Sequence, residues 1–321
     1  MAIDTHHRLS LDRIARALDV IDPVFLDSPQ FVAESLTHAT GCRVLVKVET
    51  INPIRSFKGR GAEYLTATLE GRPHLVCATA GNFGQGMAYA ARKRSLPITI
   101  FTSASANPMK VARMRALGAD VRPIGVDYDE AHRAASLYAG EIGGQLVEDG
   151  RDRAIAEGAG TIGVELLRWP ERFAAILVPV GDGALIGGVA RWIKAHAPST
   201  EVIGVVAAGA PAMERSWRAG RVQSLDTADT IADGIAVRSP FAEALDDMTG
   251  LVDDMVLVDD REMISAMRLA YEHLGVVLEP SGAAGLAGVC SRRERFAGKL
   301  IGTILTGGNV SADQLQEWVR R

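Results

Sequence analysis

The sequence predicts an α/β protein with two domains, and three observations support this prediction. Short apolar runs of strand length alternate along the chain with segments of helical periodicity. The chain has 321 residues, which is enough for one large or two modest domains. Glycine accounts for 33 of them, about a tenth where ~7% is usual, and the additional glycines cluster in turns that follow the apolar runs.

Strands are expected where apolar residues, many of them β-branched, form short runs between turns. Helices are expected where apolar residues recur with helical spacing, as between Pro108 and the stop signal at Gly118. Parallel strands joined by helices place their carboxyl ends at one edge of a sheet, where α/β proteins bind ligands. The expected strands are 43–48, 74–78, 97–101, 120–124, 174–179, 202–206 and 300–305, and the expected helices run through 87–91, 108–117 and 129–139.

The order of these elements suggests a division of the chain. Residues 71–150 contain three closely spaced strand–helix units and are expected to form a small, mobile domain. Residues 1–70 and 151–321 are then expected to form the large domain. No linker, low-complexity tract or internal repeat marks the boundaries.

The composition excludes several classes of protein. The formal net charge is −4 with no basic block, so neither nucleic acid nor an anionic membrane surface is an expected partner. Aromatic residues make up only 5%, which disfavours a base-stacking surface. No apolar run approaches the ~18 residues of a membrane span. The N-terminus also lacks the apolar core of a signal peptide.

The cysteines indicate a reducing environment. Cys42, Cys77 and Cys290 are scattered and have no zinc-type spacing, so we expect buried, reduced thiols and a cytoplasmic protein. The acidic pairs at 253–254 and 259–260 are interpreted as a turn and a helix N-terminus that flank a strand at 255–258, not as a metal site.

Four loops rich in glycine or small residues follow predicted strands, at 52–62, 79–86, 180–188 and 305–309. In the first loop Lys58 stands at a helix start, where the helix dipole favours a neutral, nucleophilic amine. Taken alone, a solvated surface lysine is the commoner explanation. Backbone N–H groups of the second and third loops can hold a carboxylate and a phosphate. The third loop is neither a Walker loop nor a complete G-x-G-x-x-G motif, which disfavours a nicotinamide-dependent oxidoreductase.

Taken together and in this order, the motifs resemble those of fold-type II pyridoxal-phosphate (PLP) enzymes, which share a tryptophan synthase β-like fold. The resemblance is to the threonine/serine dehydratase branch and spans roughly residues 20–310. The family's lysine motif SFK-x-RGA matches 56–62, and its asparagine loop matches 79–86. The glycine-rich phosphate loop matches 181–185, and two further motifs match 279–283 and 306–309.

The resemblance implies a PLP cofactor in the cleft between the domains, parallel or mixed sheets flanked by helices, and a role for each matching residue. Lys58 would be the catalytic base and would hold the cofactor as a Schiff base, while Asn82 would hydrogen-bond the cofactor's 3′-oxygen. Thr306 would face the pyridine nitrogen, where a neutral hydroxyl favours prompt loss of a β-substituent. The implied cofactor-binding residues are Phe57, Lys58, Asn82, Gly181, Asp182, Gly183, Ala184, Leu185, Gly234, Glu279 and Thr306. The implied substrate-binding residues are Ser56, Thr79, Ala80, Gly81, Asn82 and Phe83.

Several positions depart from the family pattern. Phe83 replaces the histidine of most relatives, which is either a packing change or a change in the substrate pocket. Asp182 stands where glycine or asparagine is usual, and we expect its carboxylate to point outward because a phosphate would repel it. Ala80 occupies the position of the second base of related racemases, so stereoinversion should be poor. Residues 207–213 contain no carboxylate where some relatives hold a divalent metal, so no metal is expected there.

The predicted activity is dehydration of a β-hydroxy amino acid such as L-threonine or L-serine to a 2-oxo acid and ammonia, with Lys58 removing the α-proton. A β-replacement or threonine-synthase-like enzyme is the nearest alternative, although those relatives usually carry aspartate at the position of Gly59. A racemase is less favoured. A protein that binds its ligand without catalysis is disfavoured because Lys58, Asn82 and Thr306 are all present. The resemblance also implies a homodimer.

Overall fold

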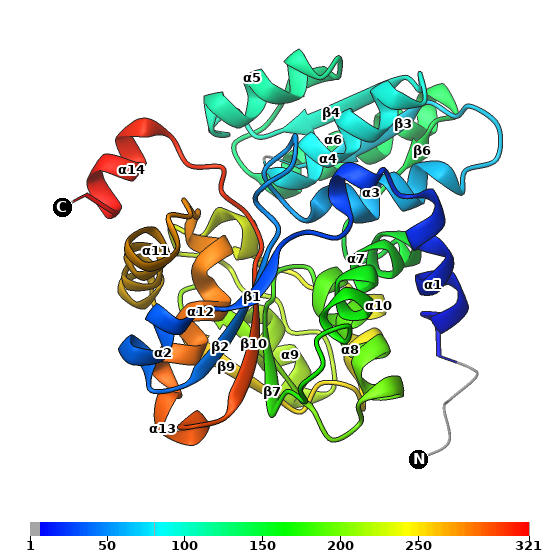
Figure 1. Cartoon of the computed structure of the whole chain (residues 1–321). Helices are drawn as coiled ribbons and strands as arrows, with labels where there is room; N and C mark the ends of the chain where they lie inside the picture. The colour runs from blue at the N-terminus through cyan, green and yellow to red at the C-terminus, as the bar shows by residue number, and fades with distance from the viewer. Residues whose placement is uncertain (1–6, 80, 321) are drawn as a thin grey trace.

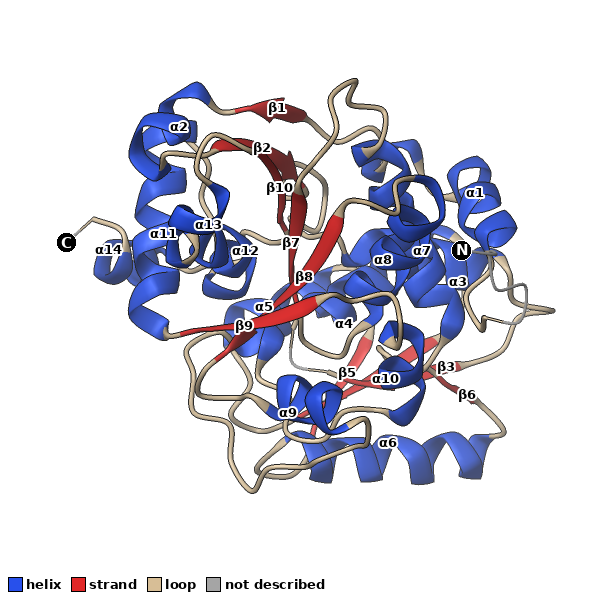
Figure 2. Ribbon diagram, turned by 90° about the horizontal axis from the view of Figure 1, so that it is seen from below, coloured by secondary structure: helices blue, strands red, loops and turns tan. Residues whose placement is uncertain are grey.

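The computed structural model describes residues 7–79 and 81–320, and within them ten strands form two separate sheets flanked by helices (Figures 1 and 2). The strands are β1 (Gln30–Val32), β2 (Arg43–Val48), β3 (Leu75–Ala78), β4 (Ile98–Thr102), β5 (Asp120–Pro123), β6 (Gln145–Leu146), β7 (Ala175–Pro179), β8 (Glu201–Ala207), β9 (Asp254–Val258) and β10 (Leu300–Leu305).

The α-helices are α1 (Leu11–Val20), α2 (Glu34–Thr40), α3 (Lys58–Ala67), α4 (Asn82–Lys93), α5 (Pro108–Ala116), α6 (Tyr128–Ile142), α7 (Arg153–Leu166), α8 (Ala184–His196), α9 (Ala212–Ala219), α10 (Ala242–Met248), α11 (Asp260–Leu274), α12 (Pro280–Ser291), α13 (Arg293–Phe296) and α14 (Ala312–Trp318). Two short 3₁₀ helices are η1 (Pro23–Phe25) and η2 (Asp233–Ile235). Among the helices of the described residues, none combines the length and the apolar character needed to cross a bilayer.

The larger sheet has six strands in the order β1-β2-β10-β7-β8-β9. β1 is antiparallel to β2, and the remaining neighbours are parallel. The last strand, β10, therefore lies between β2 from the first part of the chain and β7 from the middle, as the red, blue and green ribbons of Figure 1 show. The loops after β2, β7 and β10 consequently leave the sheet at one edge.

The smaller sheet is formed by the chain between β2 and β7. Its four parallel strands have the order β5-β4-β3-β6. Its strands lie within the segment predicted as a small domain, whereas the exact boundaries of that domain and its mobility stay predictions. The loops after β3 and β6 leave this sheet at its carboxyl edge, which brings Thr79, Gly81 and Asn82 to the same edge as residues 147–150.

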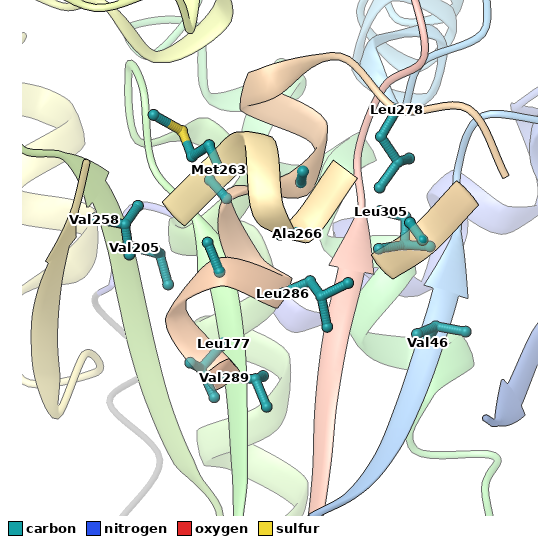
Figure 3. Packing of buried hydrophobic residues seen from close by; sticks show 14 of the residues in the cluster. Val46, Leu177, Val205, Val258, Met263, Ala266, Leu278, Leu286, Val289 and Leu305 are labelled. Carbon is teal, nitrogen blue, oxygen red and sulfur yellow. The ribbon is translucent and has the colours of Figure 1, made fainter. Parts of the chain in front are cut away.

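Apolar side chains cover both faces of the larger sheet, as expected for parallel strands buried between helices. On one face, Met263 of α11 and Leu286 of α12 pack with Leu177 and Val205 of the central strands (Figure 3). Helices α7, α8 and α10 contribute a second cluster with the same sheet. The smaller sheet packs against α6 in one cluster and against α4 and α5 in another. The loops at the carboxyl edges of both sheets therefore start from strands that are packed against helices.

The predicted strands and helices are confirmed, with shifts of a few residues at most ends. Strands 43–48 and 300–305 have the predicted bounds, but β1 and β6 were missed because they are only three and two residues long. Asp259 caps α11 in a capping box, as its interpretation as a helix N-terminus requires. Cys42 and Cys77 are buried as predicted, whereas Cys290 is only half-buried.

A buried charge cluster fixes α3 to the larger sheet. Arg60 is fully buried, and its guanidinium donates to Glu49 Oε1 and Oε2, each at 2.9 Å, and to Glu165 Oε1 at 2.7 Å. Lys47 of β2 also pairs with Glu165. Burial alone would raise the pKa of Glu165, but the hydrogen bonds and charges of Arg60 and Lys47 outweigh it and lower this pKa to about 2. The cluster joins β2, α3 and α7.

We predict that acid weakens the protein through this cluster. The folded-state pKa of Glu165 lies below that of the unfolded chain, so its contribution to stability is present above about pH 4.5 and is lost as pH falls towards about 2. Urea unfolding at successive pH values should show this loss in the unmodified protein. Glu165→Gln should show a smaller loss over the same window. Parallel pH dependences of the two proteins would contradict the assignment.

Candidate active site

A pocket of about 360 Å³ lies where the carboxyl-edge loops of the two sheets meet. Most of the predicted site residues line it, and they come from segments far apart in the sequence. Those that line it are Phe57, Lys58, Thr79, Gly81, Asn82, Phe83, Gly181, Asp182, Gly183, Ala184, Leu185, Gly234 and Thr306. Ser56 and Glu279 are not among the lining residues, and Ala80 lies outside the described part of the chain.

Lys58 is the first residue of α3 and reaches into the pocket. Its side chain is 14% exposed, and its Nζ lies 4.8 Å from the centre of the Phe57 ring. The Nζ forms an ion pair with Asp149, which follows β6. Ser56 is fully buried behind this lysine, and its Oγ accepts a hydrogen bond from the backbone N–H of Lys58 at 3.3 Å. Ser56 supports the start of α3 in this way and does not line the pocket, and its predicted role in substrate binding stays a prediction.

The loop from Gly181 to Leu185 forms a cradle at the N-terminus of α8. Gly183 has a φ of +93°, and no side chain caps the helix. A Cβ on Gly181 would lie 2.9 Å from the carbonyl oxygen of Gly234. Only glycine allows this approach, because a real side chain would push the two loops apart. The first-turn N–H groups of α8 and the positive end of its dipole therefore provide an anion site.

Asn82, the first residue of α4, joins several motif loops. Its Oδ1 accepts from Asn309 Nδ2 at 2.8 Å, and its Nδ2 donates to Glu279. Glu279 was predicted at the cofactor, but it lies behind Asn82, where Lys110 Nζ approaches it to 3.1 Å. Burial raises the pKa of Glu279, although the charge of Lys110 opposes this shift. Glu279 therefore acts on the pocket through Asn82.

The position of Phe83 supports a packing role. Its side chain is 5% exposed and belongs to the apolar cluster that contains Ile100 and Met114 beneath the smaller sheet. Phe83 also lines the pocket. On another wall, Thr306 is buried, and its Oγ1 donates to the carbonyl of Ser281 at 3.4 Å. The neutral hydroxyl predicted at this wall is thus present.

Asp182 was predicted to point outward, away from a phosphate; the structure places the residue in the lining of the pocket, and the direction of its carboxylate relative to a phosphate stays a prediction. Its side chain is half-buried and packs against Gly150, since a Cβ on that glycine would lie 2.8 Å from the Asp182 Cβ. Burial raises the pKa of Asp182 to about 7; the charge of Asp149 adds to the shift, and that of Lys58 opposes it. Because Gly150 has no side chain, Asp182 has room to pack against it.

Sequence reasoning missed the wall made by α6 and the loop after β6. Tyr128, Asp129 and His132 of α6 line the pocket, as do Asp149 and Arg238. Glu148-Asp149-Gly150 follows an apolar pair and ends in an Asp-Gly turn signal, so a fifth loop could have been recognised there. The residues of α6 gave no such signal, because only the docking of this helix brings its first turn to the pocket.

Comparison with known proteins agrees with this geometry. The family model described as "Pyridoxal-phosphate dependent enzyme" matches residues 21–307, which include every loop of the pocket. The chain belongs to this family. The predicted fold-type II α/β fold and PLP as cofactor are thereby confirmed.

Three similar proteins illustrate the range within the family. An L-threonine ammonia-lyase of Thermotoga maritima is 33% identical, with 98% of this chain and 79% of that protein aligned. The solved threonine deaminase isoform 2 of Solanum lycopersicum is 32% identical, with a TM-score of 0.89 over 95% of this chain and 86% of the other. Maize serine racemase is 29% identical, with a TM-score of 0.90 and 96% of each chain covered.

The residues present fit PLP. The glycine cradle at α8 suits a phosphate, and Lys58 presents an amine for the aldehyde. Gly234 and Ser281 line the same pocket, and a Cβ on Gly234 would lie only 2.7 Å from Ser281 Oγ. Among residues 7–79 and 81–320, no group of three or more His, Cys, Asp or Glu side chains could hold a metal ion. That the protein needs no metal stays a prediction.

We predict that Gly150→Ala weakens PLP binding by about tenfold or more. The new Cβ would lie 2.4 Å from the carbonyl oxygen of Asp182 and would displace the phosphate loop. Gly118→Ala is the matched control, because Gly118 has a similar φ, +92° against +83°, but open space around its Cβ position. Equilibrium dialysis of the cofactor measures the effect. Equal affinities for the two variants would contradict the role assigned to Gly150.

Proposed function

We propose that this protein is a PLP-dependent ammonia-lyase that eliminates the β-hydroxyl of an amino acid such as L-threonine or L-serine, giving a 2-oxo acid and ammonia. The observation that carries the proposal is that Lys58, Thr306 and the anion cradle at α8 line one pocket. The similarity to a protein named L-threonine ammonia-lyase supports it.

The chain's own residues account for the binding of the reactants. The N–H groups of Gly181 to Ala184 would bind the cofactor phosphate, and Asn82 retains one amide hydrogen to donate to the cofactor after bonding Glu279. The N-terminus of α4 follows Gly81 and has no side-chain cap, so its N–H groups suit the substrate carboxylate. Thr79 lies beside it and already accepts from the N–H of Gly81 at 3.2 Å.

The same residues account for the movement of the proton. When bound, PLP supplies an electron sink for the electron pair left at the α-carbon. Lys58 Nζ accepts the α-proton, because it is the amine that the pocket presents. Before it accepts the proton, Nζ has to leave its ion pair with Asp149 as a neutral amine. Thr306 offers a hydroxyl in place of a carboxylate, which favours early departure of the β-hydroxyl.

Two finer points remain part of the proposal. The three cysteines are all unpaired, which supports a location in the reducing cytoplasm. A homodimer is proposed from the family resemblance alone, and sedimentation of the purified protein tests it. Neither nucleic acid nor membrane is proposed as a partner.

Lys58→Ala should lose covalent attachment of PLP and reduce turnover by about 10³-fold or more, since it removes both the attachment point and the base. The visible absorption of the attached cofactor and the release of 2-oxo acid measure the two effects. Lys299→Ala, at an exposed site, is the control. A Lys58→Ala variant that remains coloured and active would refute the role of this lysine.

The reaction type is tested with the unmodified holoenzyme and L-threonine or L-serine. Equal amounts of 2-oxo acid and ammonia, with little D-amino acid, are expected. Rapid formation of the D-amino acid would indicate a racemase. Product formation only after addition of a nucleophilic second substrate would indicate a β-replacement enzyme.

A further inference from the structure

The pocket contains a buried carboxylate oxygen without a partner. Only 9% of the Asp149 side chain is exposed, and this residue lines the pocket beside Lys58. Its Oδ2 accepts from Lys58 Nζ, but its Oδ1 is buried without a hydrogen-bond partner among the described residues. Buried polar groups are almost always hydrogen-bonded, so this oxygen indicates a missing donor.

A second carboxylate lies close by. Asp182 packs against Gly150, the residue after Asp149, and the charge of Asp149 acts on it. The pKa of Asp182 is raised, first by burial and then by the charge of Asp149, while the charge of Lys58 opposes the shift. A cationic donor bound beside both carboxylates would offset their negative charge and give Asp149 Oδ1 a hydrogen-bond partner.

The other charged side chains that line the pocket already have partners. Arg238 Nη2 pairs with Asp129 and, at 2.9 Å, with Asp127. Asp233 pairs with Lys110 at 2.7 Å. His132 Nε2 lies 2.6 Å from Glu148 Oε1. Neither Arg238 nor His132 is therefore available to Asp149 or Asp182.

Lys58 cannot serve as the permanent partner either. Its Nζ reaches only one oxygen of Asp149, and the proposed reaction requires the same Nζ at the cofactor and at the α-carbon. A hydrogen-bond donor on the substrate could reach the free Asp149 oxygen, and it is not needed elsewhere during the reaction.

An aromatic ring completes the surroundings of the two carboxylates. Tyr128 is 45% exposed, so burial raises the pKa of its phenol less than a fully enclosed site would; the charges of Asp182 and Asp149 act in the same direction. Tyr128 lines the same pocket. Carboxylates combined with an aromatic face form a favourable environment for an alkylammonium group.

We propose that the preferred substrate is a β-hydroxy amino acid whose side chain carries a second amino group, bound as an ammonium ion by Asp149 and Asp182. The proposal rests on the lyase activity proposed above. For 2,4-diamino-3-hydroxybutanoate, the C–H electron pair at the α-carbon forms the new double bond, and the β-hydroxyl leaves as water with a proton. Hydrolysis then releases the α-amino group as ammonia and leaves 4-amino-2-oxobutanoate, so no oxidant or reductant is required.

The test compares two substrates of the same size and different charge. 2,4-Diamino-3-hydroxybutanoate carries a terminal ammonium where 3-hydroxynorvaline carries a methyl group. The holoenzyme should favour the cationic substrate in kcat/KM by about 10- to 100-fold. L-2,4-Diaminobutanoate and L-norvaline lack the β-hydroxyl, and their binding, followed by the visible absorption of the cofactor, should show the same preference in Kd. Equal or reversed preference in both measurements would overturn the proposal.

Isosteric variants assign the preference to its residues. Asp149→Asn and Asp182→Asn should each lower the cationic-to-neutral ratio of kcat/KM by about tenfold. Glu272→Gln removes an exposed carboxylate on α11 and should leave the ratio unchanged. If Asp149 acted only on Lys58, both substrates would lose activity equally and the ratio would stay the same, which would contradict the proposal. Asp182→Asn keeps the test decisive if the Asp149 variant does not fold.

The outcomes also separate this proposal from the proposed function. If no tested substrate, L-threonine and L-serine included, yields a 2-oxo acid, the lyase assignment fails, while the binding preference in Kd still reports on the ammonium site. If 3-hydroxynorvaline is turned over as well as its cationic counterpart, the lyase assignment stands and the ammonium site is refuted.

Discussion

The burial of one guanidinium determines where the reactive lysine lies. Arg60 follows Lys58 by two residues and is held by Glu49 after β2 and by Glu165 of α7. Leaving any of these charges unpaired inside the protein is strongly unfavourable, so the start of α3 has one position relative to the larger sheet. Helices α3 and α7 can pack closely because residue 61 is glycine. A Cβ at this position would lie 2.7 Å from the carbonyl oxygen of Ile155.

The site uses the N-termini of three helices. α3 presents Lys58, α4 presents Asn82, and α8 presents its uncapped first turn. The two sheets hold these ends in one pocket, so amine, carboxylate site and anion cradle occur together without a metal ligand cluster in the described residues. Glu279, Asn309 and Lys110 support Asn82 from outside the pocket, which explains why a motif residue such as Glu279 lies one layer behind the site.

Asp182 connects the phosphate loop with the opposite wall. Glycine or asparagine was expected at this position from the family pattern, whereas here the Asp182 side chain packs against Gly150, the residue after Asp149. The departure therefore does not indicate loss of the cofactor site. It adds a carboxylate to the lining that also contains Lys58, and Phe83 adds an apolar ring to the same lining.

The sequence by itself determined the fold class, the family, most strands to within a few residues and half of the residues that line the pocket. It could do so because parallel strands are continuous apolar runs and because loops that must approach a phosphate or another backbone need glycine. Only the tertiary structure decided that Ser56 and Glu279 lie outside the pocket lining, that Asp182 packs against Gly150, and that Tyr128 and Asp149 line the pocket. These outcomes depend on how two sheets and α6 dock, and no local pattern in the chain encodes the distance between residues 58, 149 and 182.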